Sequence, residues 1–189
     1  MKKKVSLIGF GNVGKKYFEM IKKDKRFKLV SIVDKKKIYK KNIDFFYDYK
    51  EMMRKIKADI LIIATNVDER AKIIMEAKKY KFQNIICEKP IVKNYKELIK
   101  IKSLFKYNNS IIHTHYTRRY LKEFNQLKFK IQNARNNKIL FSTFYYTKGI
   151  FHNGVHFLDF VLSLFGYPRK MIVINKKKSK TLKNDFLID

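Results

Sequence analysis

The chain has 189 residues, of which 46% are hydrophobic and 15% aromatic. This composition excludes general disorder and predicts a globular protein with one good core or two small domains. The formal net charge is +29, and the basic excess consists of 38 Lys and 7 Arg spread from Lys2 to Lys183. Specific readers of nucleic acid favour arginine, so solvated lysines are the preferred interpretation and we expect no specific nucleic-acid partner. Nucleic-acid binding remains an alternative that rests on charge alone.

Short apolar runs alternate with amphipathic segments over the first 115 residues. The runs are rich in Ile and Val, as is typical of strands buried on both faces, and the predicted strands are 5–10, 27–33, a weaker one at 44–46, 60–64, 84–87 and 110–113. Helices are predicted between them, with apolar faces at Val13, Tyr17, Met20 and Ile21, then in 68–80 and in 95–105. The alternation predicts an α/β fold with a doubly wound parallel sheet.

The pattern changes after Arg118. A helix is predicted over 118–135, a strand with aromatic residues over 139–146, a helix over 153–165 and another strand over 171–175. The basic stretch 176–184 is expected to be a loop or hairpin connection. This order suits the start of a second, α+β domain, so we expect one domain over residues 1–117 and a partial second domain over 118–189.

A glycine motif follows the first predicted strand. Gly9, Gly11 and Gly14 form a GxGxxG pattern, and Asp34 stands 20 residues after Gly14. The first glycine permits a tight strand-to-helix turn, the second lets the backbone approach a pyrophosphate, and the third lets the helix pack on the strand. The N–H groups at the start of the helix then face the phosphates. The motif therefore predicts a bound dinucleotide.

Asp34 bears on the choice of cofactor. A carboxylate at the end of the second strand accepts hydrogen bonds from the ribose hydroxyls of NAD and repels the 2′-phosphate of NADP. NAD is therefore expected. Lys35, Lys36 and Lys37 follow at once and offset that charge, so NADP stays an alternative.

Polar residues stand at the ends of the predicted strands, where ligands bind in open parallel sheets. His113 and His115 follow this pattern at the end of the last strand. The cofactor-binding residues predicted from these positions are Gly9, Phe10, Gly11, Asn12, Val13, Gly14, Asp34, Thr65, Asn66, Glu88 and Lys89.

The helix after Gly154 is apolar almost all round and is expected to be buried. His156, Asp159 and Ser163 form one polar stripe along it. Burying an imidazole and a carboxylate is costly unless the groups pair or line a cavity, and Asp159 is suited to hold His156 in one tautomer. A core histidine without a catalytic role is the alternative.

The glycine motif, Asp34, Glu88-Lys89-Pro90, Arg119 and the segment from Gly154 through His156 and Asp159 to Gly166 together resemble the Gfo/Idh/MocA oxidoreductase family. The resemblance covers essentially the whole chain. It implies a Rossmann domain that binds NAD or NADP, and an α+β domain with an open, mostly antiparallel sheet. It also implies a sugar, polyol or nucleotide-sugar-like substrate.

By the same resemblance, Lys89 hydrogen-bonds the reacting oxygen and His156 is the general acid and base. An imidazole suits proton transfer near neutrality, and an ammonium stabilises negative charge on the oxygen. The substrate-binding residues implied are Lys89, Arg119, His152, Asn153, His156 and Asp159. For Arg119 the alternative is an ion pair with a carboxylate.

Two features depart from the family pattern. His152 stands where many members carry an Asp, four residues before the catalytic histidine. The chain is also shorter than family chains, which leads us to expect a truncated product, one part of a split protein, or a short form that assembles as a homo-oligomer through its C-terminal sheet. The alternative function is a catalytically inactive nucleotide-binding remnant or regulatory protein of the same fold.

Cys87 is the single cysteine, so no intramolecular disulfide and no cysteine metal cluster is expected. The apolar run after Lys2, Lys3 and Lys4 is too short for a signal peptide, and no apolar segment approaches the length that spans a bilayer. We therefore expect a cytoplasmic protein with no metal and no membrane partner.

Overall fold

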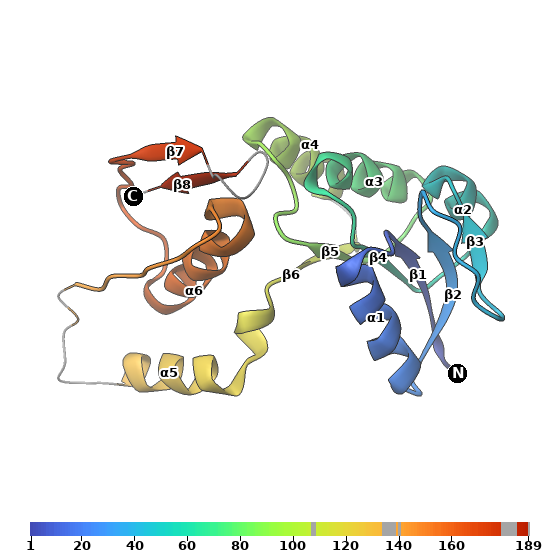
Figure 1. Cartoon of the computed structure of the whole chain (residues 1–189), viewed down its shortest axis with the longest axis horizontal. Helices are drawn as coiled ribbons and strands as arrows, with labels where there is room; N and C mark the ends of the chain where they lie inside the picture. The colour runs from blue at the N-terminus through green and yellow to red at the C-terminus, as the bar shows by residue number, and fades with distance from the viewer. Residues whose placement is uncertain (107–108, 134–138, 140, 179–184, 189) are drawn as a thin grey trace. The chain divides into compact units, whose positions relative to one another are not determined.

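The computed structural model describes residues 1–106, 109–133, 139, 141–178 and 185–188. Contacts within the chain divide it into two compact units, Met1–His115 and Tyr116–Asp189. Figure 1 shows the course of the chain through each unit. The assignment of a cofactor role to residues 1–117 and of a substrate role to 118–189 stays a prediction.

The first unit is built on a six-stranded parallel sheet with the strand order β3-β2-β1-β4-β5-β6. The strands are β1 (Lys3–Ile8), β2 (Phe27–Val33), β3 (Asp44–Phe46), β4 (Ile60–Ile63), β5 (Asn84–Glu88) and β6 (Ile111–His115). β1 lies at the centre, where Leu7 pairs with Ile32 of β2 on one side and with Ile62 of β4 on the other. β2 and β3 lie on one side of β1, and β4, β5 and β6 lie on the other. The strand order therefore reverses between β1 and β4, and their carboxyl ends flank this point.

Helices cover both faces of this sheet. They are α1 (Asn12–Lys23), α2 (Tyr49–Lys55), α3 (Val67–Lys79) and α4 (Tyr95–Phe105). α1 packs with Val5, Leu7 and Leu29 in one apolar cluster, whereas α2, α3 and α4 contribute to a second cluster around Leu61 and Ile63. Figure 1 shows α1 on one side of the sheet and α3 and α4 on the other. The prediction of a doubly wound, Rossmann-type sheet is confirmed.

The buried face of α1 differs from the predicted one. Val13 and Met20 are 39% and 61% exposed. Tyr17 is buried and Ile21 packs against the same cluster, as predicted, and Gly14 and Phe18 complete the face in place of Val13 and Met20. The four residues of the observed face have the spacing i, i+3, i+4 and i+7 of one helical face, and Val13 and Met20 lie outside it.

Helix α2 was not among the predicted elements. Asp48 caps its N-terminus, with one carboxylate oxygen accepting hydrogen bonds from the N–H groups of Lys50 at 2.6 Å and Glu51 at 2.9 Å. An Asp followed three residues later by a Glu, as Asp48 and Glu51 are, resembles the capping-box pattern that marks a helix start. That pattern was the available indication of α2 in the sequence.

The second unit holds short helices and a small antiparallel sheet. Its elements are the 3₁₀ helix η1 (Thr117–Tyr120), α5 (Lys122–Asn133), the π-helical turn η2 (Ile150–Gly154), α6 (Val155–Phe165), β7 (Lys176–Lys178) and β8 (Phe186–Ile188). β7 and β8 pair with each other, Lys177 opposite Leu187. Phe124 of α5 and Phe160 of α6 meet edge to face with their ring centroids 4.6 Å apart.

Two predicted strands of the second unit are wrong. Residues 139 and 141–146 form no strand, and residue 140 lies outside the described residues. Residues 171–175 also form no strand, and Ile172, Val173 and Ile174 are exposed; β7 begins immediately after them. Apolar content alone suggested these strands, but a strand also needs a partner for its backbone groups. The predicted helix 118–135 is divided into η1 and α5, and residues 134 and 135 are outside the described residues.

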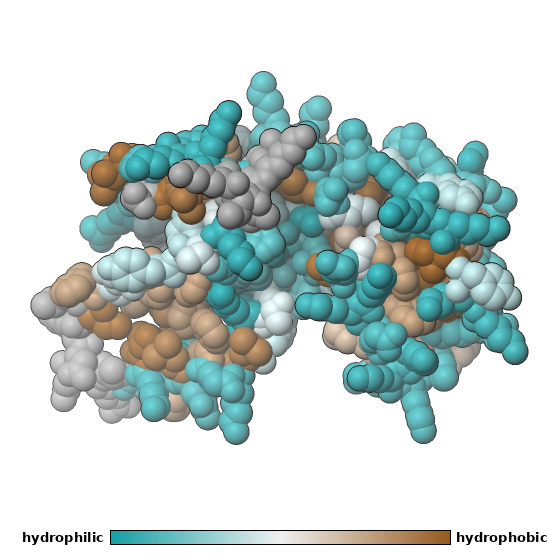
Figure 2. Space-filling view, in the orientation of Figure 1, coloured by the Kyte–Doolittle hydropathy of each residue, from teal (hydrophilic) through white to brown (hydrophobic). Residues whose placement is uncertain are grey.

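Apolar side chains reach the surface in the second unit. Leu127 and Phe129 of α5 are 45% and 68% exposed, and Figure 2 shows brown, apolar atoms over this helix. Within the described part of the chain, no helix combines the length and apolar character needed to cross a membrane.

Candidate functional site

The glycine loop joins β1 to α1 at the carboxyl end of β1. Gly9 has a φ of +92°, and a Cβ on it would lie 2.8 Å from the carbonyl oxygen of Ala64. A Cβ on Gly14 would collide with the carbonyl oxygen of Gly9, whereas a Cβ on Gly11 would meet nothing within 4 Å. The protein's own packing therefore requires Gly9 and Gly14, and Gly11 borders open space where a bound group can approach the backbone.

Helix α1 begins directly after this loop. Its first residues, Asn12 and Val13, are exposed, and its first turn contains no acidic side chain. The N–H groups at the helix start therefore keep the partial positive charge that favours a phosphate. Phe10 contributes differently from the glycines: its ring packs edge to face on Phe18, 5.6 Å between centroids, and is buried.

Asp34 ties the end of β2 to the glycine loop. Its Oδ2 accepts a hydrogen bond from the Phe10 N–H at 2.6 Å, and its Oδ1 accepts one from the Lys36 N–H at 3.0 Å. Two backbone donors thus hold the half-buried carboxylate in one orientation. Negative charge is fixed at this edge of the loop, next to the lysines of residues 35–37.

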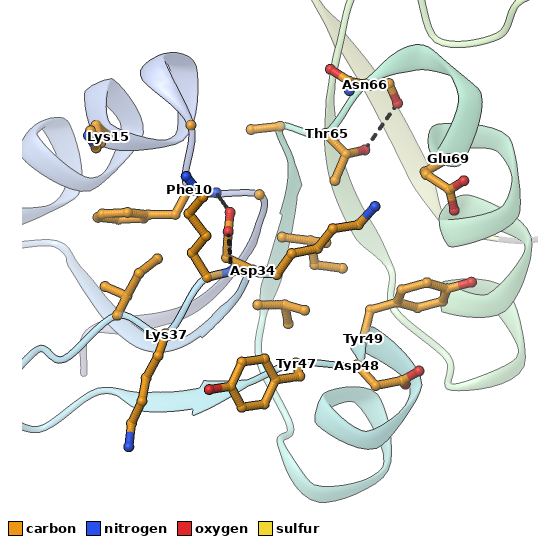
Figure 3. Close-up of a pocket in the computed structure, with 18 of the residues that line it drawn as sticks. Phe10, Lys15, Asp34, Lys37, Tyr47, Asp48, Tyr49, Thr65, Asn66 and Glu69 are labelled. Carbon is orange, nitrogen blue, oxygen red and sulfur yellow. Dashed lines mark hydrogen bonds between the residues drawn. The ribbon is translucent and has the colours of Figure 1, made fainter.

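A cleft of about 980 Å³ opens at the carboxyl ends of β1, β2 and β4. Figure 3 shows Phe10 and Asp34 on one wall and Thr65, Asn66 and Glu69 on the other. Its lining residues are Ile8, Gly9, Phe10, Gly11, Lys15, Val33, Asp34, residues 35–40, Tyr47, Asp48, Tyr49, Ala64, Thr65, Asn66, Glu69 and Ile73. The volume and the glycine wall fit an extended nucleotide ligand.

Of the predicted cofactor residues, six line this cleft: Gly9, Phe10, Gly11, Asp34, Thr65 and Asn66. Asn12, Val13 and Gly14 lie just behind the loop in α1, and Glu88 and Lys89 stand at the end of β5. Sequence reasoning missed Lys15, Tyr47 and Tyr49 as lining residues. The two tyrosines flank Asp48, whose capping pattern was not used.

Arg70 of α3 holds the loops after β4 and β5. It is only 8% exposed, and its Nε and Nη2 donate to the Thr65 carbonyl at 3.0 and 2.6 Å. Its Nη1 donates to the Pro90 carbonyl at 2.6 Å. Burial lowers the pKa of the Arg70 guanidinium. One charged fork therefore ties the loop after β4, which lines the cleft, to the loop after β5, and sequence reasoning missed Arg70.

A polar cluster stands at the ends of β5 and β6. Glu88, next to the half-buried Lys89, lies within hydrogen-bond distance of both Tyr17 of α1 and His115 of β6. Burial raises the pKa of the Glu88 carboxyl, but the contacts with His115 and Tyr17 outweigh that effect and the pKa lies below its usual value. Glu88 is thus an ionised carboxylate that is held by hydrogen bonds within the protein.

In the second unit, Asp159 of α6 is buried and binds Arg119 of η1. The Arg119 Nε donates to one carboxylate oxygen at 2.8 Å and Nη2 donates to the other at 2.7 Å. Of the two interpretations of Arg119, the structure shows the ion pair with a carboxylate. His156, one turn earlier on α6, meets the ring of Tyr116 edge to face with 6.2 Å between centroids.

His152 and Asn153 lie in the turn η2 that leads into α6. The His152 N–H donates to Asp185 Oδ2 at 2.9 Å, and the Phe151 N–H donates to Oδ1 at 2.9 Å. Asn153 Oδ1 accepts from Arg118 Nη2 at 3.2 Å. Asp185, which is 5% exposed, therefore binds the backbone of the turn that leads into α6. The sequence pattern did not single it out.

The structure brings the predicted residues together in two groups. The glycine loop, Asp34, Thr65, Asn66, Glu88 and Lys89 belong to the first unit, and Arg119, His152, Asn153, His156 and Asp159 belong to the second. Within the described residues there is no group of three or more His, Cys, Asp or Glu side chains that would hold a metal ion.

The chain is similar in fold to solved oxidoreductase structures. Myo-inositol 2-dehydrogenase from Lactobacillus plantarum aligns with a TM-score of 0.75 and 19% identity, over 88% of this chain and 57% of that one. Scyllo-inositol dehydrogenase from Lactobacillus casei, solved with NAD(H) and scyllo-inositol, gives a TM-score of 0.75 and 17% identity over the same shares.

An NAD-binding protein from Listeria innocua gives a TM-score of 0.69 and 18% identity, over 87% of this chain and 55% of that one. The chain thus spans a little over half the length of these structures. No curated protein sequence matches the chain.

Residues 3–116 match the family described as an oxidoreductase family with an NAD-binding Rossmann fold. The match covers the whole parallel sheet, the glycine loop and the strand ends that carry Asp34 and Lys89. The chain belongs to the Gfo/Idh/MocA oxidoreductase family.

Proposed function

We propose that the chain binds NAD in the cleft of its first unit and catalyses hydride transfer to or from a hydroxyl or carbonyl carbon of a sugar, polyol or nucleotide-sugar-like substrate. The observation that carries the proposal is the glycine loop. Gly9 and Gly14 are locked by packing, while Gly11 opens onto a cleft of about 980 Å³ at the start of an uncapped helix.

Named side chains of this sequence supply each part of the proposed chemistry. NAD, when bound, supplies a carbon that accepts or returns a hydride. An alcohol that loses a hydride must also lose its hydroxyl proton, and the imidazole of His156 is suited to take it. The ammonium of Lys89 stabilises the negative charge on the same oxygen. Arg119, His152, Asn153 and Asp159 are proposed to shape the substrate side, with Asp159 acting through Arg119.

NAD is the proposed cofactor, with NADP as the alternative. Asp34 holds a negative charge at the cleft through two backbone hydrogen bonds, which disfavours a 2′-phosphate. Lys35, Lys36, Lys37 and Lys40 line the same cleft and reduce that penalty. The carboxylate is fixed in place by the fold, whereas lysine side chains carry their charge on a flexible stem.

A titration of NADH fluorescence tests cofactor binding. We expect wild type to bind NADH, Gly11→Ala to bind it more weakly, and Gly11→Val to bind it more weakly still, because each added carbon projects into the open space beside Gly11. The thermal unfolding midpoints of the three proteins should agree within a few degrees. Equal NADH affinity in all three would contradict a pyrophosphate at Gly11.

Turnover is tested on a panel of sugars, polyols and nucleotide sugars with NAD and NADP. His156→Ala should lose turnover and keep its NADH affinity, because His156 lies outside the NAD cleft of the first unit. Retention of full turnover in His156→Ala would remove the acid–base role. Lys89→Met is the matching test of the oxygen-polarising role.

The second candidate function is dinucleotide binding without turnover, as in a regulatory protein of this fold. The observation that favours it is that every residue lining the cleft belongs to the first unit. NADH binding combined with no turnover across the panel would support this function and reject the enzyme.

A further inference from the structure

We propose that Tyr17, Glu88 and His115 on one side and Arg70 on the other are positioning residues that hold Lys89 and tie it to the cofactor cleft. The inference rests on the proposed function, because it concerns how the lysine assigned to the reacting oxygen is kept in place. These residues come from α1, α3 and the ends of β5 and β6, all within the first unit.

The first anchor is a three-way contact. The Tyr17 hydroxyl lies 2.8 Å from Glu88 Oε1 and 2.7 Å from His115 Nδ1, and Nδ1 lies 2.9 Å from the same Oε1. The three atoms form a triangle in which each member touches both others. Tyr17 is 6% exposed, and the side chains of Glu88 and His115 are 12% and 28% exposed.

Hydrogen counting assigns the protons of this triangle. An ionised Glu88 has only acceptors, so the Tyr17 O–H and the His115 Nδ1–H both point to Oε1. Nδ1 then also lies close enough to share its hydrogen with the tyrosine oxygen. The His115 ring therefore carries a hydrogen on Nδ1, and the carboxylate fixes the ring orientation.

The electrostatic surroundings agree with an ionised Glu88. The neighbouring groups that act on it are Tyr17 of α1, His115 of β6, Arg70 of α3 and Cys87 of its own strand. Burial and the Glu88 charge raise the pKa of the Tyr17 hydroxyl, which keeps it a hydrogen-bond donor. A buried carboxylate is stable only when it is bound in this way, so the cluster holds Glu88 firmly.

The second anchor lies on the other side of Lys89. Arg70 Nη1 donates to the carbonyl of Pro90 at 2.6 Å, and its Nε and Nη2 donate to the carbonyl of Thr65. Glu88 and Pro90 are the immediate neighbours of Lys89 in the chain. The two chain neighbours of Lys89 are thus held by part-buried, charge-assisted hydrogen bonds.

Both anchors also reach the cleft. Tyr17 lies on α1, the helix that starts at the glycine loop, and Thr65 is itself a lining residue. The position of α1 is therefore coupled to the neighbour of Lys89 on one side through Tyr17 and Glu88, and the position of the Thr65 loop to the neighbour on the other side through Arg70.

The test measures the reactivity of Lys89 in the full chain without any cofactor. Each protein is acetylated with limiting acetic anhydride from pH 7 to 11, and the labelling rate of each lysine is read by peptide mass spectrometry. Tyr17→Phe keeps the buried ring and removes one donor to Glu88. Glu88 then loses one of the hydrogen bonds that hold it, so we expect Lys89 to be less restrained and to be labelled about twofold faster at pH 8.

Tyr95→Phe is the matched control, because Tyr95 is 73% exposed on α4 of the same unit. Tyr95→Phe should leave the labelling of Lys89 unchanged. The labelling of Lys50, the reference lysine, should be the same in every protein. An unchanged Lys89 labelling rate in Tyr17→Phe would overturn the first anchor.

Arg70→Lys is the second variant. It keeps a cation but cannot bridge two carbonyl groups with a planar fork, so we expect Lys89 to be labelled at least twofold faster at pH 8. NADH titration of the same proteins separates the two proposals. Changed labelling without NADH binding supports the anchors and rejects the cofactor function, whereas unchanged labelling with normal NADH binding rejects the anchors alone.

Discussion

The two units bury their apolar residues to different degrees. Among the described residues, every buried apolar side chain except Phe160 belongs to the first unit. Helix α6 is rich in Phe, Leu and Val, yet Leu158 and Phe165 are 39% and 44% exposed. In the first unit, less apolar helices bury their faces because a sheet lies beneath them.

The difference shows that burial depends on layers more than on apolar content. The sheet of the first unit lies between α1 and the group formed by α2, α3 and α4, so central strands such as β1 and β4 are covered on both sides. The second unit offers its helices a two-stranded ribbon of three residues per strand. We therefore expect the first unit to contain most of the stability of the chain.

The largest expected effect is the slow reaction of the Cys87 thiol with a disulfide reagent. Cys87 is fully buried in β5, and burial raises the pKa of its thiol to about 12. The thiolate fraction at pH 8 is then about 1,000-fold lower than for a thiol with the ordinary pKa of 9.0, and reaction with a disulfide reagent should slow by at least that factor. This pKa favours the folded state fully below pH 9, and the advantage is lost as the pH rises from 9 to 12.

The same thiol reports on the first unit alone, because it is the single cysteine. In a urea titration we expect part of the helical circular dichroism signal to be lost while Cys87 stays protected. Simultaneous loss of helix signal and thiol protection would show that the two units unfold together.

Leucines in the two units should differ in their contribution to stability. Leu61 is 0% exposed in β4, so Leu61→Ala should lower the free energy of unfolding by about 3 kcal/mol through lost burial and a cavity. Leu127→Ala, at a 45% exposed position of α5, should change it by less than about 0.5 kcal/mol. Urea unfolding of both variants checks this, and equal losses would contradict the difference between the units.

Asp34→Asn should alter cofactor choice without altering the fold. The amide keeps an oxygen that accepts the Phe10 N–H and removes the charge that repels a 2′-phosphate. We expect the affinity for NADPH to rise about tenfold relative to NADH, measured by fluorescence titration of both. Asp48→Asn, in the same cleft but used as a helix cap, is the control and should leave the ratio unchanged.

Glu88 should produce the smallest change, a difference in acid sensitivity. Because its pKa is lowered in the folded state, the carboxylate stabilises the protein above its unfolded pKa, and this contribution is lost as the pH falls through the folded value. Wild type should therefore lose more stability than Glu88→Gln between pH 5 and 3. Parallel pH profiles of the unfolding midpoint would contradict the ionised cluster.

Much of the first unit was predictable because its pattern is local. The strand 27–33 and the helix 95–105 were predicted with the bounds that the structure has. Apolar runs without polar interruption predict strands covered on both faces, and the glycine motif predicts the turn that follows β1. In the second unit the runs at 139–146 and 171–175 were just as apolar, but pairing and cover, which the pattern does not contain, decide whether such a run becomes a strand.

The side-chain partners required the tertiary structure. Tyr17 and His115 are 98 residues apart in the sequence, and Arg119 and Asp159 are 40 apart. The strand-end rule placed Glu88 and His115 on one edge of the sheet, but it did not indicate that they bind each other through Tyr17. The sequence left Arg119 open between a substrate contact and an ion pair; the structure shows the ion pair with Asp159, and the substrate contact stays a prediction.

The sequence by itself determined the alternation of strands and helices, the glycine turn and the edge of the sheet where polar residues gather. These features follow from backbone conformation and from the periodicity of apolar residues, which act over a few neighbours. The tertiary structure decided which face of α1 is buried, that both Asp34 oxygens accept backbone hydrogen bonds, and that Glu88 and Pro90, the two neighbours of Lys89, are bound by residues distant in the sequence. Those outcomes depend on strand register and packing, which join residues far apart in the chain.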